Sequence, residues 1–306
     1  MNSFPRYEDL PLIPELGVRH SWEVLPADAG TLSRIQPQHV TDAAGLVSQG
    51  LTIPLNLPID AFDPPLFGRD RLRHTVVEAT RIDAEDVIDA FNPQGSSQID
   101  GLAHVRAREF GYFGGITELD EARQTLGMHH WARRGIAGRA VLLDMSAYAH
   151  SQGDDSGPFV GVGYDVEALE AVLQAQSLNL RVGDILLIRT GWTERFLALS
   201  TEERQAVAGW NGLRADEAMA EFLWNHGVAL VGSDNPAVEN GPGDRAIGSL
   251  HRRLLPTLGL PLMELLDFER LAQTCADRGE WAFFFVAVPM NLEGAVSSPA
   301  NAMAIL

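Results

Sequence analysis

The sequence predicts an α/β fold in which helices flank a mixed, partly closed sheet. Nearly continuous apolar runs, typical of strands buried on both faces, occupy residues 138–145, 184–190 and 228–233. Between them, apolar side chains recur at helical spacing over residues 165–176, where Asp165 is placed to cap the helix, and over residues 215–226. Such alternation of strands and helices is typical of α/β proteins.

The remaining segments add elements on both sides of this region. Residues 1–65 are rich in proline and turn signals, and we interpret them as a wrapping N-terminal segment. Within it we expect turns at 28–31 and 60–65, a short helix over 37–50 and a strand over 51–57. Beyond it we expect a strand over 75–80, a turn over 93–97, an extended stretch over 98–105, helices over 247–258 and 267–276, and a core strand over 281–289. No repeat or linker divides the chain, so we expect one domain over residues 1–306.

The charge composition argues against several classes of protein. The net charge is −18, from 23 basic and 41 acidic residues, whereas nucleic-acid binders carry a basic surface. No nucleic-acid partner is therefore expected. The chain contains no lysine, which excludes Schiff-base catalysis and the lysine of a phosphate-binding P-loop.

Cysteine content and hydropathy limit the cofactor and the location. The single Cys275 cannot form an internal disulfide, and no CxxC pair is present, so a metal would be held by His, Asp, Glu or amide oxygens. The chain shows neither an apolar run long enough for a membrane span nor a signal-peptide pattern. We therefore expect a cytoplasmic protein with no membrane partner.

One polar group of residues stands out between apolar elements. It consists of Gln94, Ser96, Ser97, Gln98, Asp100 and His104. If residues 98–104 are extended, the even spacing puts Gln98, Asp100 and His104 on one side, where an amide oxygen, a carboxylate and an imidazole could meet at a metal or a water. A turn whose Asp and Ser side chains cap backbone groups explains the same residues.

Seven blocks of the sequence resemble, in order, those of the bacterial cyclase family, which includes arylformamidases, isatin hydrolases and trans-dienelactone hydrolases. The blocks are LNLPIDAFDPPLFGR, FNPQGSSQIDGLAHV, LGMHHWARRGIAGRAVLLDM, LRVGDILLIRTGW, VGSDNPAVE, LHRRLLPTLGLPLMELLDFERLA and VAVPMNLEGAVSSPANAMAI. The resemblance implies a cyclase-like swivelling β/β/α fold, a divalent metal ion, zinc or manganese, and a homo-oligomer, either dimer or tetramer.

The resemblance also implies roles for the polar group. The arylformamidase and isatin hydrolase branch carries HxGTHxDxPxH, in which the first two His and the Asp bind metal and the last His is the proposed acid/base. The matching positions here are Gln94, Gln98, Asp100 and His104. Both ligand histidines are thus glutamines, as in the version near trans-dienelactone hydrolase, and an amide oxygen is a weaker donor to zinc that suits a harder ion.

Further ligands are implied from the C-terminal third. The family brings a His and a Glu from this region to the metal, and the matching residues are His251 and Glu264. A helix carrying His251, a turn at Gly259 and Pro261 and a short strand carrying Glu264 would bring the two side chains together. A carboxylate within the apolar run LGLPLMELL also needs a partner if it is buried.

Several residues are candidates for contact with a substrate. Aromatic side chains that could make a wall for a flat molecule, or simply fill a core, are Tyr112, Phe113 and Trp131. We interpret His129 and His130, which precede Trp131, as pocket lining rather than as ligands, and assign Gln94 and Ser97 to the same pocket. Asp234 and Glu239 follow a buried strand, where they could support the site or cap the turn.

Together these observations favour a metal-dependent hydrolase. The expected reaction opens a small amide, imide or lactone with a metal-activated water, and His104 serves as acid/base while Gln98, Asp100, His251 and Glu264 hold the metal. Two alternatives remain open at this level. One is a metal-assisted lyase or dehydratase, and the other is a non-catalytic binder of small molecules that has lost the metal.

Overall fold

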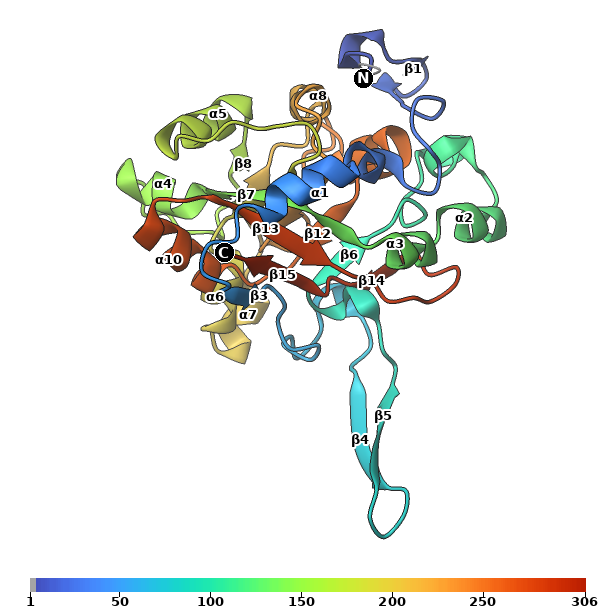
Figure 1. Ribbon diagram of the computed structural model, residues 1–306, viewed down its shortest axis with the longest axis vertical. Helices are drawn as coiled ribbons and strands as arrows, with labels where there is room; N and C mark the ends of the chain where they lie inside the picture. The colour runs from blue at the N-terminus through green and yellow to red at the C-terminus, as the bar shows by residue number, and fades with distance from the viewer. Residues whose placement is uncertain (1–3) are drawn as a thin grey trace.

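A nine-stranded mixed sheet forms the centre of the molecule. The computed structural model describes residues 4–306, and Figure 1 shows the sheet with helices around it. The strand order is β14-β6-β12-β11-β9-β7-β13-β15-β3. Strand bounds, in chain order, are β3 (Thr52–Pro54), β6 (Gln98–Asp100), β7 (Ile136–Asp144), β9 (Ile185–Arg189), β11 (Leu230–Ser233), β12 (Leu262–Glu264), β13 (Ala282–Ala287), β14 (Ser297–Pro299) and β15 (Ala302–Ile305).

The middle of the sheet is parallel and its two sides are antiparallel. Strands β12, β11, β9 and β7 run parallel to one another. On one side β6 and β14 are added antiparallel, and on the other side β13, β15 and β3 are. All side chains of β11 and nearly all of β9 are buried, which agrees with the apolar runs from which these parallel strands were predicted.

Helices cover the sheet. Helix α1 packs on β7 and β13, and α5 packs on β7 and α8. The bounds are α1 (Pro37–Ala44), α2 (Leu119–Leu126), α3 (Met128–Arg134), α4 (Met145–Ser151), α5 (Val166–Ala175), α6 (Trp192–Leu197), α7 (Thr201–Ala206), α8 (Glu217–Asn225), α9 (Leu250–Arg253) and α10 (Glu269–Arg278). Asp165 caps α5 as predicted, since its carboxylate accepts a hydrogen bond from the backbone N–H of Ala168 at 3.0 Å. No helix among residues 4–306 is long and apolar enough to cross a membrane.

Small two-stranded sheets lie outside the main sheet. They are β1 (Leu12–Ile13) with β2 (Val18–Arg19), β8 (Gly163–Tyr164) with β10 (Gly212–Leu213), and β4 (Arg73–Glu78) with β5 (Ala84–Asp89). The β4–β5 hairpin extends away from the body of the molecule in Figure 1, and residues 73–90 are all exposed. The sequence predicted a strand over 75–80 but not its partner.

Two predicted elements require correction. The extended stretch over 98–105 is a strand only from Gln98 to Asp100, because the chain turns at Gly101, where the N–H of His104 donates to the Gly101 carbonyl at 3.0 Å. The helix expected over 247–258 begins at Leu250 as α9 and continues as a π-helix over Leu254–Leu258. The wrapping segment was predicted from residue 1, and residues 1–3 lie outside the described part. The single domain remains a prediction.

Candidate metal centre

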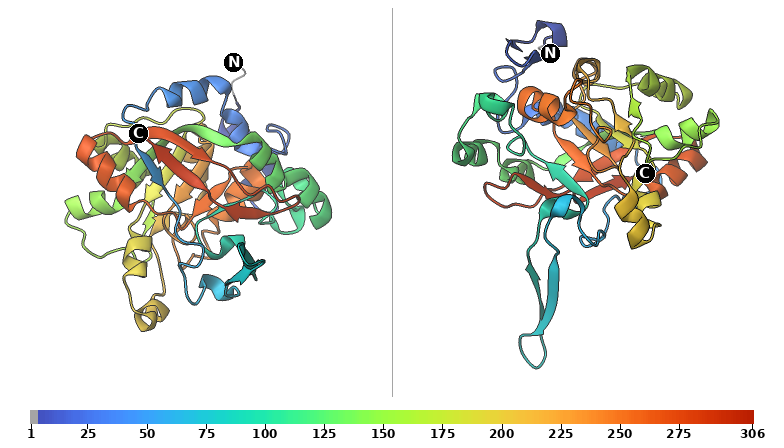
Figure 2. Two further views of the ribbon diagram at one scale, coloured as in Figure 1. Left: turned by 60° about the horizontal axis from the view of Figure 1, so that its bottom comes forward. Right: turned by 180° about the vertical axis from the view of Figure 1, so that it is seen from behind.

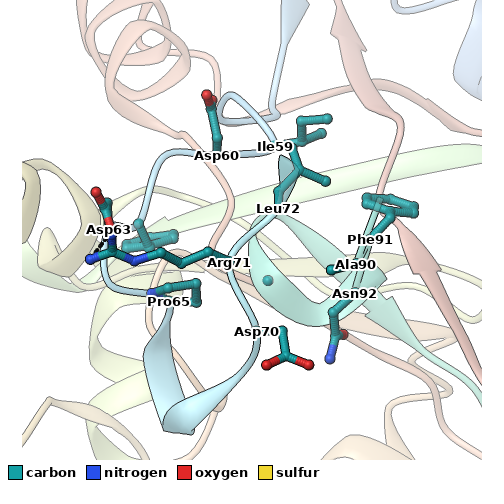
Figure 3. Close-up of a pocket in the computed structure, with 12 residues that line it drawn as sticks. Ile59, Asp60, Asp63, Pro65, Asp70, Arg71, Leu72, Ala90, Phe91 and Asn92 are labelled. Carbon is teal, nitrogen blue, oxygen red and sulfur yellow. Dashed lines mark ion pairs between the residues drawn. The ribbon is translucent and has the colours of Figure 1, made fainter. Parts of the chain in front are cut away.

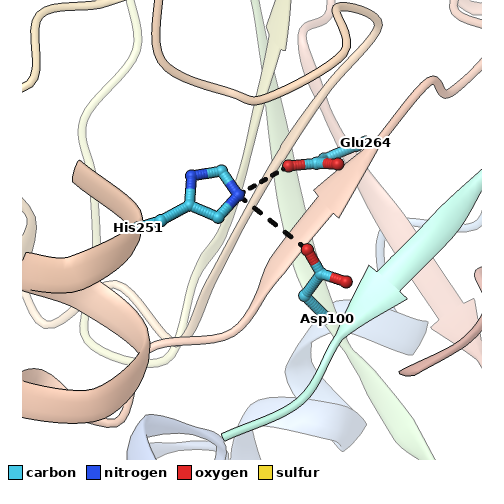
Figure 4. A group of neighbouring side chains, drawn as sticks. All are labelled: Asp100, His251 and Glu264. Carbon is cyan, nitrogen blue, oxygen red and sulfur yellow. Dashed lines mark hydrogen bonds and ion pairs between the residues drawn. The ribbon is translucent and has the colours of Figure 1, made fainter. Parts of the chain in front are cut away.

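Three acidic and imidazole side chains from separate parts of the chain meet at one point. Asp100 comes from β6, His251 from α9 and Glu264 from β12, and one ligand atom of each lies within 4.8 Å of the others. The Nε2 atom of His251 is 2.8 Å from Glu264 Oε1 and 3.9 Å from Asp100 Oδ2, as Figure 4 shows. The three side chains predicted as metal ligands thus lie close together, and their binding of a cation stays a prediction.

Strand pairing explains why the two carboxylates converge. In the antiparallel ladder of β6 and β12, Leu262 is opposite Asp100, and Glu264 is opposite Gln98. Residues two apart in a strand share a face, and directly opposed residues share it too, so Gln98, Asp100 and Glu264 lie together. Gly259, in the left-handed conformation with φ of 68°, ends the π-helix after His251 and turns the chain into β12.

The carboxylates of the centre are buried, and they outnumber the single imidazole of His251. Burial and, after it, the neighbouring Asp100 raise the pKa of Glu264 to about 7, against the hydrogen bond from His251. Burial lowers the pKa of His251, but its hydrogen bonds to Glu239 and Glu264 outweigh burial and raise that pKa well above the ordinary value. Both shifts show that the cluster favours bound positive charge.

Gln98 completes the set of donors. Its side-chain amide donates to Glu264 Oε2, while its own Oε1 and the Oδ2 of Asp100 are buried without a hydrogen-bond partner in the described residues. Buried polar atoms in proteins almost always have partners, so unsatisfied oxygens beside an imidazole and two carboxylates fit a divalent cation. The residues present are thus chemically suited to the metal that the sequence implied.

Gln94 and His104 border this cluster. The side-chain amide of Gln94 donates to Asp100 Oδ1 at 2.9 Å and lies 3.2 Å from Nε2 of His104. The Nε2 atom of His104 is 3.7 Å from Asp100 Oδ2, and its side chain is 27% exposed. The turn at Gly101, and not the alternation of side chains along a strand, brings His104 next to Asp100. His104 lies at the solvent-exposed edge of the cluster.

Glu239 positions His251. Its carboxylate accepts hydrogen bonds from Ser249 Oγ at 3.1 Å and from the backbone N–H groups of Leu250 and His251, and it lies 3.2 Å from Nδ1 of His251. An Nδ1–H that donates to Glu239 would leave the Nε2 lone pair to bind a cation in place of the proton that Nε2 shares with Glu264. The sequence left open whether Glu239 supports the site or caps a turn, and this carboxylate does both.

Asp234, its neighbour in the same loop, has a structural role. It accepts hydrogen bonds from the backbone and hydroxyl of Thr190 at 2.7 and 2.8 Å and from the backbone N–H of Gly191 at 2.7 Å. Burial raises the pKa of Asp234 to about 6, although these bonds and Arg189 oppose the shift. Asp234 therefore connects the loop after β9 to the loop after β11 by hydrogen bonds.

Ser97 lies next to the centre but uses its hydroxyl for the backbone. The hydroxyl donates to the Leu265 carbonyl at 2.5 Å and accepts from the N–H of Leu57 at 2.8 Å. Ser97 thus fixes the strand segments that carry Gln98 and Glu264. A direct contact with substrate stays a prediction.

The other predicted pocket residues are buried except for His130, which is partly exposed. Phe113 is fully buried, and a Cβ placed on Gly259 would lie 2.6 Å from its ring. Tyr112 is buried too. The indole of Trp131 donates to the Asp28 carbonyl at 2.9 Å, His129 Nδ1 accepts from the N–H of Gly294 at 3.2 Å, and His130 Nε2 is 3.0 Å from the Gln124 carbonyl. None of them contacts the metal cluster among the interactions of residues 4–306, so their substrate-binding roles stay predictions.

Fold and site together define an α/β protein with a buried carboxylate and imidazole centre suited to a divalent metal. The model of the cyclase family, described as "Putative cyclase", matches residues 50–240, which is more than half of the chain. The protein belongs to the cyclase family. No curated protein matches the chain.

Solved structures agree with this assignment. A structure described as a novel cyclase has a TM-score of 0.81 and 27% identity, and the match covers 94% of this chain and 99% of that one. Isatin hydrolase A from Labrenzia aggregata, bound to benzyl benzoate, gives 0.57 and 17%, covering 86% and 94%. A "predicted metal-dependent hydrolase" from Bacillus stearothermophilus gives 0.51 and 18%, covering 83% and 97%. The expected cyclase-type fold, a mixed sheet flanked by helices, is confirmed.

Proposed function

We propose that this protein is a metal-dependent hydrolase that opens a small amide, imide or lactone by adding water across a C–N or ester C–O bond. The observation that carries the proposal is the convergence of Asp100, His251 and Glu264 within 4.8 Å of one another. Membership of the cyclase family and the fold shared with isatin hydrolase support it.

Zinc or manganese would be held by Asp100, His251 and Glu264, with the amide oxygen of Gln98 as a further donor. Such an ion polarises a carbonyl and lowers the pKa of a water molecule toward neutrality. Three of these four donors are oxygens, a set that suits manganese at least as well as zinc.

Side chains of the protein carry out the proton transfer. His104 lies at the exposed edge of the cluster, where its Nε2 can accept a proton from water and return it to the leaving nitrogen or oxygen. Gln94 contacts both His104 and Asp100, and it holds the imidazole beside the site of reaction. Glu239 keeps His251 oriented toward the two carboxylates.

Two variants test the assignment. Asp100→Asn removes a ligand charge, so protein purified without chelators should lose its metal, as measured by elemental analysis. His104→Ala removes only the acid/base, so it should keep its metal while turnover falls by about 100-fold or more. Full metal content in the first variant, or unchanged turnover in the second, contradicts the assigned role.

A panel of formamides, isatin-like imides and lactones tests the reaction class. Product mass should increase by one water. Loss of one water would show a lyase or dehydratase instead, and absence of metal in the unmodified protein would show a non-catalytic binder.

We also propose a homo-oligomer, dimer or tetramer, in the cytoplasm. Native mass spectrometry tests the first statement, and cell fractionation tests the second.

A further inference from the structure

The segment of residues 57–72, which we call the strap, runs past the metal centre. Its first residues are bound to those that flank the ligands: Leu57 N–H donates to Ser97 Oγ at 2.8 Å, and Ser96 Oγ donates to the Pro58 carbonyl at 2.7 Å. Leu57 also packs in a cluster with Leu265, the residue after Glu264. The start of the strap is therefore fixed against β6 and β12.

The strap meets the centre again further along. The ring of Phe67 lies edge-on to that of Trp210, with centroids 6.1 Å apart. The indole of Trp210 in turn donates to the carbonyl of Glu239 at 2.9 Å, and Glu239 is the residue that positions His251. Phe67 nevertheless stays 61% exposed, so an aromatic surface is left open next to Trp210.

Arg69 lies on this part of the strap and has no partner. Its guanidinium is 5.1 Å from the centre of the Phe67 ring, and no hydrogen bond or ion pair is found for it within residues 4–306. Arg71, two residues along, is paired with Asp63 at 2.8 Å (Figure 3). The pair borders a cavity of about 310 Å³, which is also lined by Gly95, the neighbour of Gln94. Of the two arginines on the strap, Arg69 is the one without an ion pair in the described residues.

Contacts from Phe67 through Trp210 to Glu239 bring this part of the strap to the His251 side of the centre. Partial burial lowers the pKa of Arg69, while Glu264 and then Asp100 raise it, which agrees with this placement. A divalent ion would balance the negative charges of Asp100 and Glu264, but the negative charge of Glu239 would remain. In a chain of net charge −18, an anionic substrate needs a cation at this edge of the site.

We propose that Arg69 binds a carboxylate on the substrate, so that the amide, imide or lactone opened here also carries an acid group. The planar part of the substrate lies against Phe67. This inference rests on the proposed hydrolase function and specifies its substrate class. A guanidinium matches a carboxylate with two parallel hydrogen bonds, and a partly buried, unpaired one gains most from that pairing.

Calorimetric titration of the metal-loaded protein with succinate and with butyrate tests the proposal without turnover. The two probes have the same chain length, but only succinate offers a second carboxylate. The unmodified protein should bind succinate at least about tenfold more tightly than butyrate. Arg69→Gln should abolish this preference, and Arg69→Lys should restore part of it. Arg71→Gln, which removes an arginine already paired with Asp63, should keep the preference.

Kinetics supply a second test. A lactone that carries a carboxylate and the same lactone with a primary carboxamide are compared in each variant. In Arg69→Gln, the kcat/KM for the acid should fall roughly 10- to 100-fold, mainly through KM, while that for the carboxamide changes little.

The outcomes separate the two proposals. A succinate preference that survives Arg69→Gln, or is absent from the unmodified protein, overturns the role of Arg69 while metal content and hydrolysis of neutral substrates still support the hydrolase. Absence of metal from the unmodified protein defeats the hydrolase, and the role of Arg69 falls with it because it rests on that function; metal content thus tells the two failures apart.

Discussion

At the scale of single residues, the geometry of the centre depends on a carboxylate outside the proposed set of metal ligands. Glu239 contacts the Nδ1 side of His251 and the backbone at the start of α9, so it fixes both the ring and the helix end. Residues that hydrogen-bond a metal-binding histidine set its tautomer and raise its basicity. We expect Glu239→Gln to weaken metal binding by about 10- to 100-fold, as measured by equilibrium dialysis, because the amide turns an N–H toward His251.

A matched control is available on α7. Glu203 is exposed, and its carboxylate caps that helix through Ser200. Glu203→Gln makes the same change in charge and shape but should leave metal affinity unchanged. If Glu239→Gln bound metal as tightly as the unmodified protein, the orienting role of Glu239 would be wrong.

The sequence indicated some of these residues better than others. Family resemblance predicted that Asp100, His251 and Glu264 lie together. These residues are far apart along the chain, so no local sequence pattern indicates that they meet. Glu239 was noted only as a carboxylate after a buried strand, since its hydrogen bonds to His251 depend on how α9 folds back. Arg69 was not singled out, because a proline-rich loop has no periodicity from which the position of a side chain can be inferred.

At the scale of elements, burial determined which predictions succeeded. The apolar runs over 138–145, 184–190 and 228–233 correspond to β7, β9 and β11, whose side chains are buried in the centre of the sheet. Strand β5, with the sequence AEDVID, is wholly exposed and so has no apolar pattern to reveal it. Short helices such as α6 and α7 have too few residues to establish a period.

The mistaken extension of β6 also has a physical cause. The chain leaves the strand at Gly101, whose N–H donates to the Val296 carbonyl at 2.9 Å. A Cβ at this position would lie 2.9 Å from that same oxygen, so only glycine permits the approach. The turn depends on a segment nearly two hundred residues away and could not be inferred from residues 98–105 alone.

The turn from α9 to β12 depends on Gly259. Its φ of 68° is strained for other residues, and a Cβ would lie 2.6 Å from the buried ring of Phe113. Left-handed strain costs about 1–2 kcal/mol and overpacking about 1–3 kcal/mol, so we expect Gly259→Ala to lower the free energy of unfolding by roughly 2–5 kcal/mol in urea titrations.

Gly153→Ala separates strain from overpacking. Gly153 has a similar φ of 81°, but a Cβ there meets no atom within 4 Å. This control should lose only about 1–2 kcal/mol. Equal losses in the two variants would show that Phe113 yields to the added methyl and does not hold the turn.

At the scale of the whole molecule, the β4–β5 hairpin is the feature that projects away from the rest of the described chain. The rear view in Figure 2 shows it extending away from the sheet and helices. Its strands are exposed on both faces, and apolar side chains such as Val76 and Ile82 are 61% and 91% exposed. An isolated two-stranded hairpin is marginally stable in water. Because this hairpin is exposed on both faces, we infer that it is only marginally stable as well.

Hydrogen exchange provides a direct test at this scale. Opening of the hairpin exposes no core, whereas exchange in β9 requires much of the central sheet to open. We expect the amides of β4 and β5 in a dilute sample to exchange at least about a thousandfold faster than those of β9, since the free energies of the two openings differ by several kcal/mol. Equal protection of the hairpin and β9 would contradict the marginal stability inferred for the free hairpin. Protection that grows with protein concentration would show that a second copy covers the hairpin and would place the contact of the proposed homo-oligomer there, because association then stabilises the closed form by mass action.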